Sequence, residues 1–283
     1  RVMFAKFARS WSLVKASAGV LRQDKELLVF PAISVVASLL VMASFILPLF
    51  GLLDFKAMEQ GDREPMWLYA WVFLFYLAQY FVIFYFNTAL VGAAMIRLHG
   101  GDPTVADGLN IAWSKRGTIF GYALIAATVG MILRAIEERA GVIGKWVAGF
   151  LGAAWTVVTF MTVPILVSRD IGPVDAVKES ALLLKKTWGE NLIGQGGVGI
   201  VFGLLQFLVI ALMVVALIAV AATKSVALIV TVVAIGVFAM MALALIQAAL
   251  SGIYSAALYR HAMGEETLGM DRALLDAAFA VKR

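Results

Sequence analysis

The residues best suited to metal chemistry are the two histidines of the chain, His99 and His261. Each lies just after an arginine at the end of a long apolar run. With Asp102 they would supply the imidazole and carboxylate ligands of a metal site. Two histidines so far apart in the sequence are weak evidence for such a site, and solvated helix ends are the favoured interpretation. We expect no bound metal.

Other catalytic sets are equally hard to assemble. The chain has no cysteine, which excludes thiolate metal sites, disulfides and cysteine nucleophiles. No motif orders a serine, a histidine and an aspartate as in a hydrolase. The sequence therefore predicts a protein that is not an enzyme and that needs no cofactor.

Amides provide most of the polarity inside the apolar runs. They are Gln79, Asn87, Asn191, Gln195, Gln206 and Gln247. Hydrogen bonds of this kind between membrane helices contribute about 0.6–2 kcal/mol each, so helix packing is the favoured interpretation. The alternative is a polar path for a solute or a lipid headgroup.

Ionisable residues, which mark proton and ion pathways in membrane proteins, are almost absent from the runs. Arg134 precedes Glu137 and Glu138 at the edge of one run, where a surface ion pair at helical spacing is expected. Proton-coupled transport is therefore disfavoured.

Glycines gather at the start of the fifth run, where Gly199 and Gly203 form a GxxxG motif. This motif permits close packing of two helix backbones, and a hinge is the alternative. A phosphate-binding loop is a poor alternative, because no Gly-Lys-Ser/Thr follows the glycines.

The elements that must position these residues are membrane helices. Hydrophobic residues make up 63% of the chain, charged residues 14%, and the mean hydropathy is +0.94. The continuous apolar runs are too long for β-barrel strands and suit helices that cross a hydrocarbon core of about 30 Å. We therefore expect one all-α membrane domain over residues 1–283, with six transmembrane helices near 27–53, 66–96, 117–136, 146–168, 191–223 and 225–259.

The basic residues predict an orientation. Residues 1–26, 97–116, 169–190 and 260–283 together hold 17 of the 23 Lys and Arg, and the segments on the other side hold six. Cytoplasmic segments carry such an excess, so both termini are expected in the cytoplasm. The same asymmetry explains the net charge of +5, and no nucleic-acid partner is expected.

Amphipathic helices are expected on the cytoplasmic side at 1–26, 102–116 and 173–188, with a fourth amphipathic segment at 265–283. Asp102-Pro103 and Pro173 are predicted helix starts, because proline suits the first helical position. Val174, Val177, Ala181 and Leu184 are predicted to share one face. Pro103 and Pro173 lie 70 residues apart, which suggests a unit of one surface helix and two spans repeated three times.

The surface helices supply the candidate lipid-binding residues, because basic and aromatic side chains suit the headgroup region. These residues are Lys6, Arg9, Trp11, Lys15, Arg22, Lys115, Arg116, Lys185 and Lys186.

Two runs have further peculiarities. The second is rich in aromatic residues through its whole length, and helix packing is favoured over a hydrophobic ligand groove. The last two hold 33 and 35 residues without a charge, more than a bilayer core requires. They are expected to tilt or bend, or to project beyond the lipid and be covered by another subunit.

The string FARSWSLVKASAGVLRQDKELLVFP, residues 7–31, resembles the N-terminal signature of an uncharacterised family of bacterial polytopic membrane proteins, a domain of unknown function. The P-x-x-A helices before spans are similar, more weakly, to membrane domains found beside glycerophosphodiester phosphodiesterases. The resemblance implies a multi-pass protein of the bacterial cytoplasmic (inner) membrane, and it supplies no catalytic residue.

Two functions remain open. The first is a protein that binds anionic lipids of the cytoplasmic leaflet and organises a homo-oligomer or a complex with another membrane protein. The second is a translocator of lipids or small solutes, with Gln79, Asn87, Gln195, Gln206 and Gln247 along its path.

Overall fold

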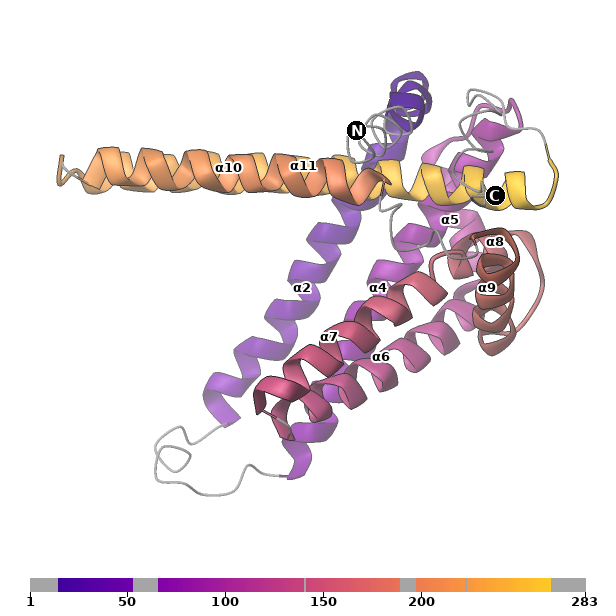
Figure 1. The fold of residues 1–283 in the computed structure, drawn as a ribbon, viewed down its shortest axis with the longest axis horizontal. Coiled ribbons are helices and arrows are strands. Elements are labelled where there is room, and N and C mark those ends of the chain that lie inside the picture. The colour runs from indigo at the N-terminus through magenta and orange to yellow at the C-terminus, as the bar shows by residue number, and fades with distance from the viewer. Residues whose placement is uncertain (1–14, 53–65, 140, 189–196, 222, 266–283) are drawn as a thin grey trace. The chain divides into compact units, whose positions relative to one another are not determined.

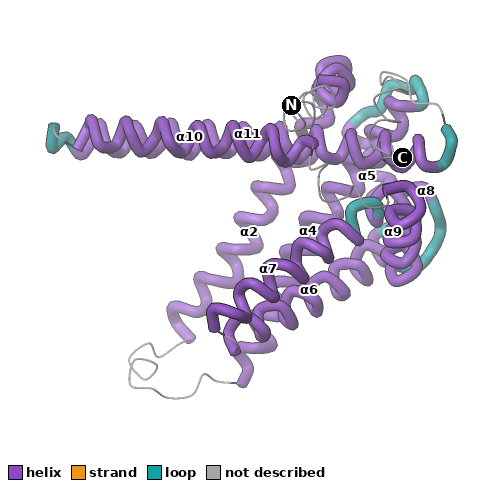
Figure 2. The backbone as a smooth tube through the Cα atoms, viewed as in Figure 1, coloured by secondary structure: helices purple, strands orange, loops and turns teal. Residues whose placement is uncertain are grey.

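The computed structural model describes residues 15–52, 66–139, 141–188, 197–221 and 223–265, and the described part is helical throughout, with turns and no strand. Residues 15–23 are helical. The further elements are η1 (Lys25–Leu28), α2 (Val29–Leu52), α4 (Met66–Leu98), α5 (Val105–Ser114), α6 (Arg116–Arg139), α7 (Gly141–Val158), α8 (Thr162–Ser168), α9 (Pro173–Trp188), α10 (Gly197–Ala221) and α11 (Val226–Ala262) (Figures 1 and 2).

Six segments of the described chain are long and apolar enough to cross a membrane. They are Lys25–Phe50, Met66–Leu98, Arg116–Arg139, Ile143–Ser168, Val201–Ala221 and Val226–Ala262. The predicted all-α class and the predicted number of membrane-spanning helices are confirmed, and the protein is a multi-pass membrane protein.

The chain divides into two compact units. Unit 1 contains residues 1–28, 94–103 and 186–283, and unit 2 contains residues 29–93 and 104–185. In unit 2, α2 packs on α4, where Trp71 Nε1 donates to the Phe45 carbonyl at 3.1 Å and Gln79 Nε2 donates to the Ser38 carbonyl at 3.0 Å. Helices α6 and α7 lie side by side (Figure 1).

Helix α5 packs against the membrane helices of unit 2. A Cβ added at Gly108 would lie 2.4 Å from Phe30 Cζ and 2.7 Å from the Ala89 carbonyl oxygen, so only glycine fits there. A Cβ added at Gly92 of α4 would lie 2.9 Å from Ile111 Cδ1. Helix α5 is therefore docked on α2 and α4 through small residues.

The predicted start of α5 at Asp102-Pro103 is wrong. The N-cap is Thr104, whose Oγ1 accepts from the Asp107 amide at 3.2 Å while the Asp107 carboxylate accepts from the Thr104 amide at 2.9 Å. This capping box satisfies two amides at once, which a lone Asp102 cannot do. Asp102 instead forms an ion pair with Arg97.

Helix α9 begins at Pro173, as predicted, and Pro173 lies against Gly121 of α6, where an added Cβ would be 2.8 Å from Pro173 Cγ. Its buried positions are Ala176, Ser180 and Leu184. The predicted face is wrong at Val174, which is 51% exposed. The buried face is instead centred on Ala176, where small residues allow α9 to lie close to the membrane helices.

In unit 1, α10 and α11 form an antiparallel hairpin along which the two helices contact each other (Figure 1). Gln206 Nε2 donates to Gln247 Oε1 at 3.0 Å, and a Cβ added at Gly236 would lie 2.3 Å from Met213 Sδ. Ser225 caps the start of α11. The rest of the hairpin's apolar surface is open, because none of the most apolar window of α10 and 6% of that of α11 is buried, against 50% for α4.

The great length of α11 has a simple explanation. Its 37 residues extend about 55 Å, but nearly all residues from Ala249 to Arg260 are buried within the chain. The uncharged run therefore combines a membrane-facing part with a part that the protein itself covers.

Candidate functional site

The fourth candidate span, Ile143–Ser168, is interrupted within unit 2. Helix α7 ends at Val158 and α8 begins at Thr162. Pro164 has no N–H to donate to the carbonyl four residues earlier, that of Phe160, and its ring crowds that carbonyl. Pro164 thus weakens a helix through residues 159–161, and the structure has a turn there, although the apolar run predicts one continuous span.

Ser180 of α9 binds the two ends of this break. Its Oγ donates to the Val158 carbonyl at 2.6 Å and accepts from the Met161 amide at 3.1 Å. In an unbroken helix each of these two backbone groups would instead bond to a backbone group four residues away. Because unsatisfied backbone groups are costly in a membrane interior, a hydroxyl from a neighbouring helix stabilises the break.

Further buried hydroxyls surround the break. Tyr122 of α6 is 3% exposed and lies beside the side chains of Thr159 and Thr162. Thr159 Oγ1 donates to the Trp155 carbonyl at 2.8 Å. Thr162 is fully buried, and its side chain lies within hydrogen-bonding reach of Tyr122. Tyr122 and the two threonines therefore form one buried group of neutral hydroxyls.

An aromatic row connects this region with the far end of α6. The rings of Tyr76, Tyr80 and Phe84 are stacked at spacings of four residues, with centroids 6.4 and 5.7 Å apart, and Phe84 stacks on Tyr122 at 4.3 Å. At the far end Arg134 contacts the Tyr76 hydroxyl at 3.5 Å. Two buried atoms of unit 2, Gln79 Oε1 and Thr88 Oγ1, lack a described hydrogen-bond partner.

We call this set of residues in unit 2 the hydroxyl column. It consists of Tyr76, Tyr80, Tyr122, Thr159, Thr162 and Ser180. Its polar groups are neutral, so it can donate and accept hydrogen bonds but offers no charge to an ion. The arrangement suits recognition of an uncharged polar group and supplies no nucleophile with a base.

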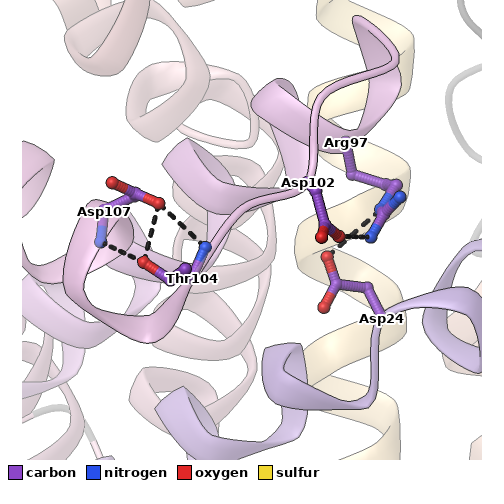
Figure 3. Close-up of polar contacts among 5 residues, drawn as sticks. All are labelled: Asp24, Arg97, Asp102, Thr104 and Asp107. Carbon is purple, nitrogen blue, oxygen red and sulfur yellow. Dashed lines mark hydrogen bonds and ion pairs between the residues drawn. The ribbon is translucent and has the colours of Figure 1, made fainter.

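Unit 1 has a separate charged cluster, in which Arg97 binds two carboxylates (Figure 3). Its Nε lies 3.2 Å from Asp24 Oδ2 and its Nη2 2.5 Å from Asp102 Oδ1. Asp24 is buried, whereas the Asp102 side chain is 94% exposed. The two pairs therefore lie in very different dielectric environments.

The histidines do not form the metal site considered from the sequence. His99 Nδ1 donates to the Met95 carbonyl at 2.7 Å, and its Nε2 lies 3.7 Å from Glu265, which also pairs with Arg260. No group of three or more His, Asp and Glu that could hold a metal occurs in the part of the chain that the structure describes. An ion-pair network takes the place of a ligand set.

Figure 3 also shows the capping box of α5 in unit 2. The Asp107 carboxylate accepts hydrogen bonds from the Thr104 hydroxyl, at 2.7 Å, and from the Thr104 amide. These bonds favour the ionised form and lower the pKa of Asp107.

The predicted lipid-binding residues have different environments. Lys115 Nζ is engaged by the Arg169 carbonyl at 3.0 Å and by Asp170 at 3.3 Å. Arg116 is exposed and lies over the Trp113 ring, 4.7 Å from its centroid. Lys15, Arg22 and Lys185 are exposed, and Lys186 belongs to α9. Lys6, Arg9 and Trp11 lie outside the described residues, as do most residues of the 265–283 tail.

The residues of the predicted polar path are divided between the two units. Gln79 bonds α2 to α4 in unit 2, and Gln206 and Gln247 bond α10 to α11 in unit 1, which is the packing role expected of amides. Asn87 is half-buried on α4, and Gln195 lies outside the described residues. Nothing lies within 4 Å of a Cβ added at Gly199 or Gly203, so the GxxxG motif makes no close packing within the described chain.

The sequence interpretation missed Trp113, Thr162, Pro164 and Ser180. Pro164 is a visible signal, because a proline inside an apolar run favours a kink or a break. Ser180 and Thr162 carry no such signal, because their importance depends on which helices meet. Arg134 was interpreted correctly, and its Nε lies 2.7 Å from Glu138 Oε1 on the exposed surface.

A family model matches residues 66–269, which is most of the chain, and its description is a family of unknown function, DUF6159. The chain belongs to this family. The expected membership of a family of unknown function is thereby confirmed, while the matched range does not include the N-terminal string at 7–31. Neither a curated protein nor a solved structure gives a significant match.

Proposed function

We propose that this chain is a non-enzymatic protein of the bacterial cytoplasmic membrane that binds anionic lipids through its surface helices and organises a membrane assembly. In this proposal both termini lie in the cytoplasm. The support is the excess of Lys and Arg in the terminal segments and in the connections on the same side of the membrane. The ends of the membrane helices that carry α5 and α9 then face the cytoplasmic leaflet.

The observation that carries the proposal is the exposed pair of Trp113 and Arg116. Trp113 is 61% exposed although α5 is packed on the membrane helices through its other face. A tryptophan beside an arginine suits the boundary between acyl chains and phosphates. On α9, Val174 and Leu182 are also exposed, at 51% and 65%.

The absence of cysteine makes this placement testable by spin labelling. A nitroxide at Trp113→Cys should show the high oxygen and low nickel-chelate accessibility of the headgroup boundary. A nitroxide at Asn110→Cys, on the polar side of α5, is the matched control and should contact water. Equal aqueous exposure of both labels would refute lipid contact.

Lipid preference requires a second measurement. Native mass spectrometry should show retained phosphatidylglycerol on the wild-type chain and less of it on Arg116→Gln. Arg139→Gln, a like change at the other end of α6, is the control and should retain the lipid. Equal retention by Arg116→Gln and the wild type would remove Arg116 from the proposal.

The assembly part rests on the open apolar surface of the α10–α11 hairpin. We propose a second copy of the chain, or another membrane protein, on this surface. Native mass measurement in nanodiscs should show dimers or larger species as the protein-to-disc ratio rises. Monomer alone at every ratio would contradict this part.

The hydroxyl column favours a second candidate function, translocation of a small uncharged polar solute. The buried group of neutral hydroxyls formed by Tyr122, Thr159 and Thr162 is the specific observation. Proteoliposomes should take up glycerol faster than protein-free vesicles, and Tyr122→Phe with Thr162→Val should abolish the difference. Gln206→Leu, which changes a packing amide, is the control and should leave uptake intact. If the double substitution left uptake unaffected, the hydroxyl column would be rejected as the path of the solute.

A further inference from the structure

We propose that α9 is a movable cover on the hydroxyl column, held closed by the two hydrogen bonds of Ser180. The inference deepens the second candidate function, on which it rests for its biological purpose. Its structural content, a local opening at the break in the fourth span, can be measured without any transport assay.

The first step concerns what holds α9 in place. The buried positions of α9 are Ala176 and Ser180, which are small and bury little apolar area, and Leu184 near the other end of the helix. The ion pair between Arg169 and Glu179 is partly exposed, and such pairs add little stability. Leu184 and the two hydrogen bonds of the buried Ser180 hydroxyl are therefore what hold α9 closed beyond its anchored start.

The second step concerns how α9 can move. Residues 169–172 are not helical and end in Gly172, directly before Pro173. Pro173 lies on Gly121 of α6 and holds the start of the helix in place. A rotation in this connection would lift Ser180 from the break while the start of α9 stays near α6.

The third step concerns what the movement would expose. Without Ser180, the Met161 amide and the Val158 carbonyl lose their partners and must be satisfied by water. The break lies beside Thr159, Thr162 and Tyr122. Lifting α9 would thus hydrate the column at its α9 end, and closing it would exclude water.

The alternative is that Ser180 caps a rigid bend that never opens. Both interpretations predict a stable fold, but they differ in the local exchange of the Met161 amide. A rigid cap lets this amide exchange only when the core unfolds, whereas a movable cover lets it exchange by local opening.

Cysteine accessibility tests the cover in membranes. Met161→Cys places a thiol at a buried position of the break, and the chain has no other cysteine. Adding Ser180→Ala should raise its modification rate by a water-soluble methanethiosulfonate about fivefold or more, because a buried hydrogen bond is worth about 1 kcal/mol or more when its partners remain. Ser44→Ala, which removes an exposed serine hydroxyl that bonds the Val41 carbonyl, is the control and should leave the rate unchanged.

Amide exchange of the wild-type protein provides a measurement that needs no variant. Met161 should exchange by a route insensitive to mild denaturant and faster than Ala123, a buried residue of α6. An unchanged thiol rate in Ser180→Ala, or exchange of Met161 only together with Ala123, would overturn the cover. If the break opens as described but no solute crosses the bilayer, the cover stands and translocation fails.

Discussion

The Arg97 cluster allows a strong test of how burial decides the value of an ion pair. The shorter contact, 2.5 Å to Asp102, involves a carboxylate that is 94% exposed. The longer contact, 3.2 Å to Asp24, involves a carboxylate that is 5% exposed. If distance decided the contribution of an ion pair to stability, the pair with Asp102 would contribute more. If burial decides it, the pair with Asp24 contributes more.

The magnitudes follow from the two environments. An exposed ion pair contributes about 0–1 kcal/mol, because water screens it. Removal of one partner of a buried pair leaves an uncompensated charge and costs about 3–5 kcal/mol. We therefore expect Arg97→Gln to lower the free energy of unfolding by about 3–5 kcal/mol, and Asp102→Asn by at most about 1 kcal/mol.

Reversible unfolding in mixed micelles, followed by helical circular dichroism, gives the required free energies. Asp24→Asn removes the buried charge but keeps a polar group, so its cost should lie between those of Arg97→Gln and Asp102→Asn. A cost for Asp102→Asn equal to that of Arg97→Gln would refute the reasoning, because the exposed contact would then account for the whole effect.

Three further predictions concern single helices. The capping bonds lower the pKa of Asp107. The stabilisation of α5 by the Asp107 carboxylate should therefore be complete above about pH 4, near the unfolded pKa, and lost as the pH falls through the lower pKa of the folded state. Amide exchange of the first turn of α5 should accelerate as the carboxylate is protonated, and this acceleration should be absent in Asp107→Asn. Gly236→Leu should destabilise the hairpin by about 1–3 kcal/mol because the side chain would collide with Met213, whereas Gly203→Leu, with open space around it, should change the free energy of unfolding little. Pro164→Ala should lengthen a spin-label distance measured across the break, because the regained N–H permits a continuous helix; an unchanged distance would assign the break to Ser180 alone.

The spans and the start of α9 were predictable because they depend on local properties. Apolar length identifies each membrane helix, and Pro173 marks the start of α9 because proline is favoured at the first helical position. The start of α5 was missed because two local signals competed, and the reciprocal bonds of Thr104 and Asp107 outweigh the cap offered by Asp102.

The hydroxyl column could not be predicted in the same way. Serine and threonine occur throughout the chain, and only the packing of α9 onto the break makes Ser180 different from Ser44. Likewise, Gln206 and Gln247 were predicted to be packing amides, but their partnership depends on the register of an antiparallel hairpin. Tertiary contacts decide such roles, and spacing within one helix does not reveal them.

The α10–α11 hairpin also has a consequence for the lipid that surrounds the protein. The span of α10 contains 21 residues, and the part of α11 before its buried end has a similar length, so both correspond to about 32 Å of hydrocarbon. Whatever part of this surface a second copy leaves uncovered would face acyl chains, and the length of the hairpin then sets the bilayer thickness at which the protein is least strained. The acyl-chain length of the host membrane is thus a variable that should tune the stability of this hairpin more than that of α4, half of whose apolar window is enclosed by protein.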